Sequence, residues 1–341
     1  MILFNCDYLE GCHPKILERL NQTNLEQTVG YGEDHYCQKA AALIRKTFDC
    51  EGSAVHFLVG GTQTNTTVIA AALRPYEGVL SADTGHINVH ETGAIESSGH
   101  KVLALPHTNG KITAQQVREA VALQGNDEHI VKPGMVYISL STEFGTLYSL
   151  EELKALHDAC QELHLPLFVD GARLGYALAS PANDIPVTEL AKLCDVFYIG
   201  GTKVGALFGE ALVISNEDIN RNFRYMIKQR GGMLAKGRLL GLQFLTLMED
   251  GLYFSIAEKA VRQAMAIRDA LMEKNIPLLI DSPTNQLFPV FTNEQLKRLN
   301  EQFEFAFWEK VDATRSCVRI CTSWATTEEN VAALIDAIDA L

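Results

Sequence analysis

Lys203 is the residue of this sequence whose type and position most directly suggest covalent chemistry. It ends the run Gly200-Gly201-Thr202-Lys203, which follows the apolar segment Val196–Ile199. A lysine in a tight loop beyond a buried strand is placed to form an imine, because desolvation lowers the pKa of its amine and favours the nucleophilic free base. A lone lysine of this kind is equally compatible with an ordinary solvated side chain, so Lys203 needs partners before a function follows.

A carboxylate and a guanidinium follow a second short apolar segment. Leu167–Val169 leads directly into Asp170-Gly171-Ala172-Arg173. Asp170 has the chemistry to pair with a protonated ring nitrogen, which a cofactor acting as an electron sink requires. Arg173 has the chemistry to hold a substrate carboxylate through two parallel hydrogen bonds. Taken alone, this tetrapeptide would be explained as well by a surface salt bridge.

A glycine pair between a strand and a helix offers a place for an anion. Gly60-Gly61-Thr62-Gln63 follows the apolar run Val55–Val59 and opens a helix-like segment. Glycines let backbone N–H groups approach a phosphate, and the first turn of a helix presents unpaired donors and the positive end of its dipole. The segment is not a P-loop, because no Gly-Lys-Ser/Thr follows at the required spacing. A plain strand-to-helix turn is the alternative interpretation.

His86 ends a fourth segment of this kind, Asp83-Thr84-Gly85-His86, which follows the strand-like run Val79–Ala82. An imidazole at this place could stack on a planar ring or move a proton. His90 lies four residues further on with Glu91 beside it, which suggests a metal site. The spacing does not match His-Glu-x-x-His and no third ligand is evident, so we expect no metal.

The elements that must position these residues alternate between strand and helix signals. Apolar segments predict strands at Val55–Val59, Val79–Ala82, Lys101–Leu105, Met135–Leu140, Leu167–Val169 and Val196–Ile199. Helices are predicted at Thr62–Leu73, Thr113–Leu123 and Ser149–His164, the last with a Ser149/Glu152 capping box. Strands separated by helices indicate an α/β fold with a mainly parallel sheet covered on both faces. Ligands of such sheets collect beyond the carboxyl ends of the strands, where all four segments lie.

The pattern changes after about Gly237. A long helical stretch reaches about Lys274 and is predicted to break near Gly251. Strand-like runs and a closing helix follow at Leu287–Phe291, Phe303–Trp308, Cys317–Cys321 and Glu328–Leu341. We therefore expect a large domain over residues 1–240, N-terminal segment included, and a smaller C-terminal α+β domain over residues 241–341.

The composition excludes several classes of protein. The 341 residues carry a formal net charge of −13, which disfavours binding to the phosphate backbone of nucleic acids. No apolar run approaches the roughly 20 residues that span a bilayer, and the N-terminus has no basic segment typical of a signal peptide. The eight cysteines are scattered without a Cys-x-x-Cys pair, as expected of reduced thiols in the cytosol. We expect a cytoplasmic protein that binds neither nucleic acid nor membranes.

Taken together, the segments resemble the threonine aldolase family, part of the beta-eliminating lyase group of enzymes that depend on pyridoxal phosphate (PLP). The similarity covers nearly the whole chain and also includes Asp7, Tyr31-Gly32-Glu33-Asp34, Gly93-Ala94 and Arg319. The combination is specific although the individual motifs are not. The resemblance implies the PLP-dependent transferase-like fold (fold type I, as in aspartate aminotransferase), with a mainly parallel seven-stranded sheet in the large domain.

The resemblance also implies how the cofactor is held. Lys203 is then the Schiff-base lysine, Asp170 pairs with the pyridinium nitrogen, and His86 stacks on the ring. Arg173 is expected to lie against the cofactor as well. The phosphate would be held by Gly61, Thr62 and Gln63.

For the substrate, the resemblance implies that Arg173 and Arg319 bind the carboxylate of a small amino acid. Cys6 lies near the place where the family often has a serine. Tyr31 is expected to reach the active site of a neighbouring subunit, since the family forms homodimers and homotetramers with shared active sites.

The sequence departs from the family pattern in three places. Glu143 aligns where some members carry a histidine that is discussed as a proton carrier. Lys203 follows Gly-Gly-Thr, whereas many members have a serine directly before the lysine. Gly231-Gly232 and Lys236 resemble a loop that carries an arginine elsewhere.

The activity implied by the resemblance is cleavage of a β-hydroxy-α-amino acid, such as threonine or allo-threonine, to glycine and an aldehyde. The base that removes the hydroxyl proton stays open among His86, Glu143, His90 and a bound water. Other PLP-dependent reactions on the same scaffold are alternatives, either β-elimination or an aldolase for phenylserine-like substrates. A non-catalytic protein of this fold is a further alternative. An NAD-binding Rossmann protein is disfavoured, because Gly-x-Gly-x-x-Gly does not follow the first strand.

Overall fold

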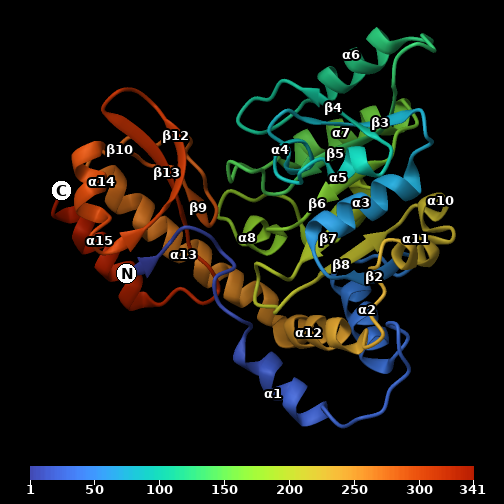
Figure 1. The fold of residues 1–341 in the computed structure, drawn as a ribbon, viewed down its shortest axis with the longest axis horizontal. Helices are drawn as coiled ribbons and strands as arrows, with labels where there is room; N and C mark the ends of the chain where they lie inside the picture. The colour runs from blue at the N-terminus through green and yellow to red at the C-terminus, as the bar shows by residue number, and fades with distance from the viewer.

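The computed structural model describes residues 1–341 and contains three β-sheets surrounded by helices (Figure 1). The largest sheet has the strand order β2-β8-β7-β6-β5-β3-β4. Its strands are β2 (Ala54–Leu58), β3 (Glu77–Ala82), β4 (Lys101–Leu105), β5 (Lys132–Ser139), β6 (Leu167–Asp170), β7 (Val196–Gly200) and β8 (Glu210–Ile214). Only β8 runs antiparallel to its neighbours, and the other pairs are parallel. The predicted mainly parallel seven-stranded sheet is confirmed, with β8 as the strand that the apolar pattern did not locate.

Helices cover both faces of this sheet, as the buried strands require. Within β7, Phe197 and Ile199 belong to one core cluster, whereas Val196 and Tyr198 belong to another on the opposite face. The first cluster is bounded by α1 (Pro14–Thr23), α2 (His35–Thr47), α6 (Ala114–Gln124), α7 (Leu150–Glu162), α8 (Leu174–Leu178), α9 (Val187–Leu193), α12 (Arg238–Met248) and the first half of α13 (Leu252–Glu273). The second is bounded by α3 (Gly61–Ala72), α4 (His86–Val89), α5 (Ala94–Ser97), α10 (Glu217–Asn220) and α11 (Phe223–Gln229). Each fully buried large apolar side chain stabilises the fold by about 1.5–3 kcal/mol.

Local helix signals agree closely with the structure. Ser149 caps α7, and its hydroxyl and the Glu152 carboxylate form the predicted capping box. The long helical stretch is interrupted where expected, because a 3-10 turn at Glu249–Gly251 separates α12 from α13. Asp250 and Gly251 in that turn have positive φ angles of 53° and 68°, which end a right-handed helix.

Two of the three predicted C-terminal strands are divided, whereas the one predicted at Cys317–Cys321 is longer and begins at Arg315. The expected strand at Leu287–Phe291 is two strands, because Pro289 between them has no N–H to donate. The expected strand at Phe303–Trp308 is also two strands, which pair with different partners. The strands and helices of this part are β9 (Gln286–Leu287), β10 (Val290–Thr292), α14 (Asn293–Leu299), β11 (Phe303–Glu304), β12 (Ala306–Lys310), β13 (Arg315–Cys321) and α15 (Glu328–Asp339).

The N-terminus lies against this C-terminal part. Strand β1 (Ile2–Leu3) pairs in parallel with β11, and Figure 1 shows the N-terminal end beside α13 and α15. Helix α13 packs at both ends, since Ala257 belongs to the core beneath the large sheet and Ile267 to the C-terminal core. The division into domains near residue 240 stays a prediction. None of the helices combines the length and the apolarity that crossing a membrane would need.

Candidate active site

The carboxyl ends of the parallel strands surround a cavity that contains most of the candidate residues. Two of these strands, β6 and β7, end at Asp170 and Gly200, and the loops that follow carry Arg173 and Lys203. The candidate residues that line the main cavity are Gly61, Thr62, His86, Glu143, Asp170, Arg173 and Lys203. An adjoining cavity shares four of them and adds His90, Trp308 and Arg319. Four loops that are distant in the sequence therefore meet at one place, as the parallel topology requires.

Asp170 is buried at the end of β6 and is fixed by four donors. The hydroxyls of Tyr137 and Tyr198 each donate to it at 2.5 Å, the Asn65 amide donates at 3.2 Å, and the Ala172 N–H donates at 3.0 Å. The turn after it needs glycine, because a Cβ on Gly171 would lie 1.8 Å from the Tyr198 carbonyl oxygen. The carboxylate is thus held in one orientation at the cavity wall.

A chain of hydrogen bonds joins Asp170 to His86. The Asn65 amide that reaches Asp170 also donates to Glu91 Oε1 at 2.7 Å, and Glu91 Oε1 lies 2.8 Å from His86 Nδ1. Asn65 and Glu91 are buried. In the tautomer whose Nδ1–H donates to Glu91, Nε2 of His86 is the acceptor nitrogen. The imidazole is therefore oriented by the same network that holds Asp170.

The amine of Lys203 lies in the cavity without a partner. No hydrogen bond or ion pair is made by its Nζ, although its backbone carbonyl accepts a hydrogen bond from Tyr176 at 2.6 Å. Burial and the nearby positive charge of Arg173 lower the pKa of Lys203, while the carboxylates of Asp7, Asp170 and Glu210 oppose that shift. A lysine with a lowered pKa has a larger share of the nucleophilic free base at a given pH than an ordinary lysine.

Two arginines lie near Lys203, and only one of them is paired with a carboxylate. Arg173 forms a two-point ion pair with Asp7, in which Nε and Nη2 reach the two carboxylate oxygens at 2.7 and 2.9 Å. Arg319 has no carboxylate partner: its Nη2 donates to the Asn5 carbonyl at 3.2 Å, its Nη1 donates to the Gln286 amide oxygen at 3.5 Å, and its buried Nε has no acceptor. Its guanidinium lies 5.9 Å from the centre of the Trp308 ring. Arg319 is therefore the guanidinium whose charge has no carboxylate counterpart within the chain, which leaves it able to pair with an incoming carboxylate.

Two groups near His86, Glu143 and His90, can accept a proton. Glu143 Oε1 accepts hydrogen bonds from the His86 N–H at 2.9 Å and from the Ser139 hydroxyl at 2.8 Å. Burial raises the pKa of Glu143 despite the Ser139 hydrogen bond. Burial and the charges of His86, Arg319 and Lys203 lower the pKa of His90, so that its imidazole stays neutral near pH 7. No group of three or more His, Cys, Asp or Glu side chains is arranged to hold a metal ion.

Three predicted site residues do not line the cavity within one chain. The side chain of Gln63 is engaged elsewhere, since its carbonyl accepts from the Val59 N–H at 3.3 Å and its amide donates to the Arg230 carbonyl at 3.3 Å. Only the backbone N–H of Gln63 is left for a phosphate. Cys6 is half-buried and is absent from both cavity linings.

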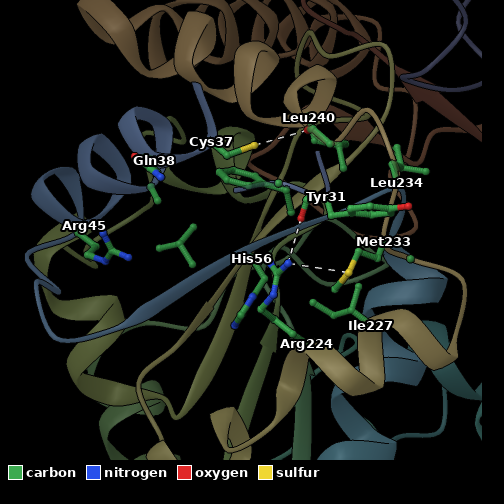
Figure 2. Close-up of a pocket in the computed structure, with 16 residues that line it drawn as sticks. Tyr31, Cys37, Gln38, Arg45, His56, Arg224, Ile227, Met233, Leu234 and Leu240 are labelled. Carbon is green, nitrogen blue, oxygen red and sulfur yellow. Dashed lines mark hydrogen bonds between the residues drawn. The ribbon is translucent and has the colours of Figure 1, made fainter. Parts of the chain in front are cut away.

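Tyr31 lies in a separate pocket, which Figure 2 shows between α2, β2 and α11. Its backbone carbonyl accepts a hydrogen bond from Arg224 at 3.2 Å, and Lys228 lies 4.8 Å from the centre of its ring. Leu234 lines the same pocket, in the loop where the family resemblance pointed to an arginine nearby. Lys236 in that loop is exposed.

Comparison with known proteins agrees with the chemistry of this site, in which a free lysine amine lies beside a buried carboxylate. A sequence profile described as beta-eliminating lyase matches residues 6–294. The chain belongs to the beta-eliminating lyase family. As a member of this family it is a lyase that depends on PLP.

Relatives of this beta-eliminating lyase share its sequence over almost its full length. A low specificity L-threonine aldolase from a Pseudomonas species is 32% identical over 96% of this chain and 94% of its own length. Another from Pseudomonas aeruginosa is 32% identical over 87% of this chain and 84% of its own. A solved structure of the Leishmania major threonine aldolase superposes with a TM-score of 0.98 at 43% identity, over 100% of this chain and 99% of that chain. Aspartate aminotransferase from Thermus thermophilus shares the fold alone, with a TM-score of 0.73 at 15% identity over 100% of this chain and 91% of that one.

The residues of this lyase fit PLP. The free amine of Lys203 and the buried carboxylate of Asp170 line the same cavity as the amino end of α3 at Gly61-Thr62. A ring N–H that binds Asp170 would take the place of one of its four present donors, since a carboxylate has about four lone-pair sites. An aldehyde, a pyridine nitrogen and a phosphate thus each have a chemically suitable group in the cavity.

The local sequence pattern missed several residues of the site. Asn65, Tyr8, Trp308 and Glu210 all line the cavities or join the networks described above. One signal was available for Glu210, because it heads an otherwise apolar segment, Glu210–Ile214. A carboxylate on a buried strand is uncommon without a partner or a function.

Proposed function

We propose that this lyase cleaves the Cα–Cβ bond of β-hydroxy-α-amino acids such as threonine or allo-threonine, releasing glycine and an aldehyde. The observation that carries the proposal is the unpaired amine of Lys203, which shares one cavity with the buried Asp170 carboxylate and an adjoining cavity with Arg319, a guanidinium without a carboxylate partner. The relatives named threonine aldolase, at 32% identity over 96% of the chain and at 43% identity in the superposed structure, support the same substrate class.

The cofactor would be held by residues from four segments, at the ends of β2, β3, β6 and β7. Lys203 attaches it through its amine, Asp170 faces the ring nitrogen, and His86 covers the ring. The phosphate lies at the amino end of α3, against Gly61, Thr62 and the backbone N–H of Gln63. When bound, PLP supplies the electron sink for the electrons of the breaking Cα–Cβ bond.

The substrate would be oriented by its carboxylate. Arg319 binds the carboxylate with its free donors. Arg173 contributes Nη1, because its Nε and Nη2 are held by Asp7. A planar guanidinium suits this task, since two parallel hydrogen bonds fix both the position and the rotation of a carboxylate.

The proton of the β-hydroxyl would be taken by His86 or Glu143. Nε2 of His86 is available because Glu91 holds Nδ1. Oε2 of Glu143 is available because Oε1 receives both hydrogen bonds of that carboxylate. Burial raises the pKa of Glu143, which brings it closer to the operating pH than an ordinary carboxyl group.

The oligomeric state and the compartment complete the proposal. The chain acts as a homodimer or homotetramer in which Tyr31 reaches the active site of a neighbouring copy. Support for this comes from Tyr31 itself, whose side chain is 46% exposed and lies outside the Lys203 cavity of its own chain. A cytoplasmic location agrees with eight free cysteines, seven of them buried.

The test is product analysis with purified protein and PLP. We expect glycine and acetaldehyde from threonine or allo-threonine, whereas a 2-oxo acid with ammonia would identify β-elimination instead. Phenylserine in parallel measures whether a bulky β-substituent is accepted. Lys203→Ala should lose the borohydride-reducible adduct and at least about 1,000-fold in kcat. Threonine cleavage by Lys203→Ala at the rate of the unmodified enzyme would refute the assignment.

A further inference from the structure

Glu210 is a buried carboxylic acid in the Lys203 cavity that takes no part in the proposed binding of cofactor or substrate. It is the first residue of β8, the antiparallel strand of the large sheet, and it pairs with Gly200 at the end of β7. Its exposed fraction is 4%, and it lines the cavity together with Thr202 and Lys203. No lysine, arginine or histidine forms a close ion pair with it, so its charge has no direct counterpart.

Both oxygens of Glu210 bind the two residues that precede Lys203. The Gly201 N–H donates to Oε2 at 2.9 Å, and the Thr202 hydroxyl donates to Oε1 at 2.9 Å. The same hydroxyl accepts a hydrogen bond from the Gly209 N–H at 3.0 Å. The carboxylate of Glu210, which follows the loop, therefore holds the start of the loop that carries the lysine.

This loop has little freedom to find another conformation. The N–H groups of Gly201 and Thr202 also reach the Gly209 carbonyl at 3.0 and 3.1 Å. Gly209 has a φ of 112°, and a Cβ there would lie 2.4 Å from the Leu240 side chain. The backbone hydrogen bonds between Gly201, Thr202 and Gly209, together with the buried Glu210, hold the backbone of Lys203 in one position.

Lys203 is the positively charged group that remains to balance the charge of Glu210. Asp7 is paired with Arg173, and Asp170 receives four hydrogen bonds. The amine of Lys203 is the remaining cation without a bonded partner in the cavity.

The titration of Glu210 reflects these neighbours. Burial raises the pKa of Glu210 to about 7, and its hydrogen bonds with Thr202 and Gly201 and the charge of Lys203 oppose the shift. Asp170 adds a like charge that raises it further. The hydroxyls of Tyr198 and Tyr253 complete its titratable surroundings, and burial raises the pKa of each, so both stay neutral.

We propose that Glu210 is a positioning residue for Lys203, whose carboxylate holds the loop before the lysine and balances the charge of its amine. The inference rests on the proposed function, because it takes Lys203 as the residue that captures the cofactor. An ionised Glu210 stabilises the ammonium form of Lys203, so removing its charge should favour the free amine at lower pH. Position and charge are separate effects, and different variants distinguish them.

The experiment follows the capture of PLP by the apoenzyme as a function of pH. The rate of forming the borohydride-reducible adduct reports the fraction of Lys203 in the free-amine form. Glu210→Gln keeps the size of the side chain and one acceptor oxygen, which can still receive the Gly201 N–H, and its amide N–H can donate to the Thr202 hydroxyl oxygen, but the charge is removed. We expect the midpoint of its pH profile to move down by about one unit, which is about ten-fold faster capture between about pH 7, above which Glu210 is ionised, and the Lys203 midpoint. Well below pH 7, where Glu210 is protonated, the two profiles should converge. Circular dichroism confirms that each variant is folded.

Companion variants separate position from charge. Thr202→Val keeps the Glu210 charge and removes one contact, so capture should be slower at every pH with an unchanged midpoint. Glu210→Asp keeps a carboxylate and should keep the midpoint of the pH profile. If Glu210→Gln does not fold, the effect of the charge is measured by comparing Glu210→Asp with Glu210→Ala. Glu217→Gln, an exposed glutamate in α10, is the matched control and should behave as the unmodified enzyme.

Each outcome has a definite meaning. A Glu210→Gln profile that superposes on that of the unmodified enzyme would overturn the role of its charge, and unchanged capture in Thr202→Val would overturn the role in positioning. If the unmodified enzyme itself forms no reducible adduct, the proposed function fails rather than this inference.

Discussion

The carboxylate of Asp7 and the guanidinium of Arg173 form a buried two-point ion pair that ties the N-terminal segment to the loop after β6. The two N–O distances are 2.7 and 2.9 Å, and the Asn285 amide donates to the same carboxylate at 2.9 Å. Burial alone would raise the pKa of Asp7, but the charges of Arg173 and Lys203 and these hydrogen bonds lower it to about 2. Arg173 is therefore fixed at the cavity before any substrate arrives.

Asp7→Asn should destabilise the protein strongly, because it leaves the Arg173 charge buried without its partner. We expect the free energy of unfolding at pH 7 to fall by about 3 kcal/mol, measured by urea denaturation. The pKa of Asp7 is below its ordinary value of 3.8, so this stabilisation is complete above about pH 4 and declines as the pH falls toward 2. The variant should lack that acid-dependent decline. Asp281→Asn, in the exposed pair with Arg268, is the control and should have a much smaller effect.

Arg319→Gln should weaken substrate binding through the carboxylate. Loss of charge-assisted hydrogen bonds predicts a KM for threonine that is about 10- to 100-fold higher, with a smaller effect on PLP affinity. The amide of threonine, which lacks the carboxylate, provides the control. It should be a poor substrate for the unmodified enzyme and no worse for Arg319→Gln. An equal loss with both compounds would mean that Arg319 has a general structural role instead.

Glu143→Gln tests the proton acceptor. If Glu143 accepts the β-hydroxyl proton, kcat should fall by about 10²- to 10⁴-fold, while the bound cofactor keeps its absorbance. Burial raises the pKa of Glu143, so the rate of the unmodified enzyme should rise with pH through a value above 4.5, and this limb should vanish in the variant. Ser139→Ala removes a hydrogen bond that favours the carboxylate and should move the limb to higher pH. An unchanged kcat in Glu143→Gln would assign the proton to His86 and leave Glu143 as a cap of α4.

Asn65→Ala should disconnect His86 from Asp170. The amide of Asn65 donates to both Glu91 and Asp170, so its removal leaves two buried carboxylates with one donor fewer each. We expect PLP affinity to fall by about ten-fold or more, measured by fluorescence titration of the apoenzyme. Asn65→Asp should be worse, because a third carboxylate repels the other two. Asn88→Ala, an exposed asparagine in α4, is the control, and a similar loss there would show that the network is not the cause.

The sequence by itself determined the class of fold and the centre of the site. Apolar segments alternating with helix signals require a mainly parallel sheet, and the carboxyl ends of parallel strands share one edge. His86, Asp170 and Lys203 each follow such a strand closely, so their convergence could be predicted from chain order. Gly61 could be placed at the same edge for the same reason.

Only the tertiary structure decided which partners these residues have. Asp7 meets Arg173 across 166 positions of the chain, and Arg319 arrives on a strand of another sheet, so no local pattern could pair them. The Gln63 amide donates to the Arg230 carbonyl, and the Tyr31 carbonyl accepts from Arg224 in a separate pocket. Both contacts are made with a segment that is distant in the sequence. Glu210 is the clearest case. Strand β8 runs antiparallel, so its first residue rather than its last lies at the active-site edge, and strand direction is set by pairing in the folded sheet.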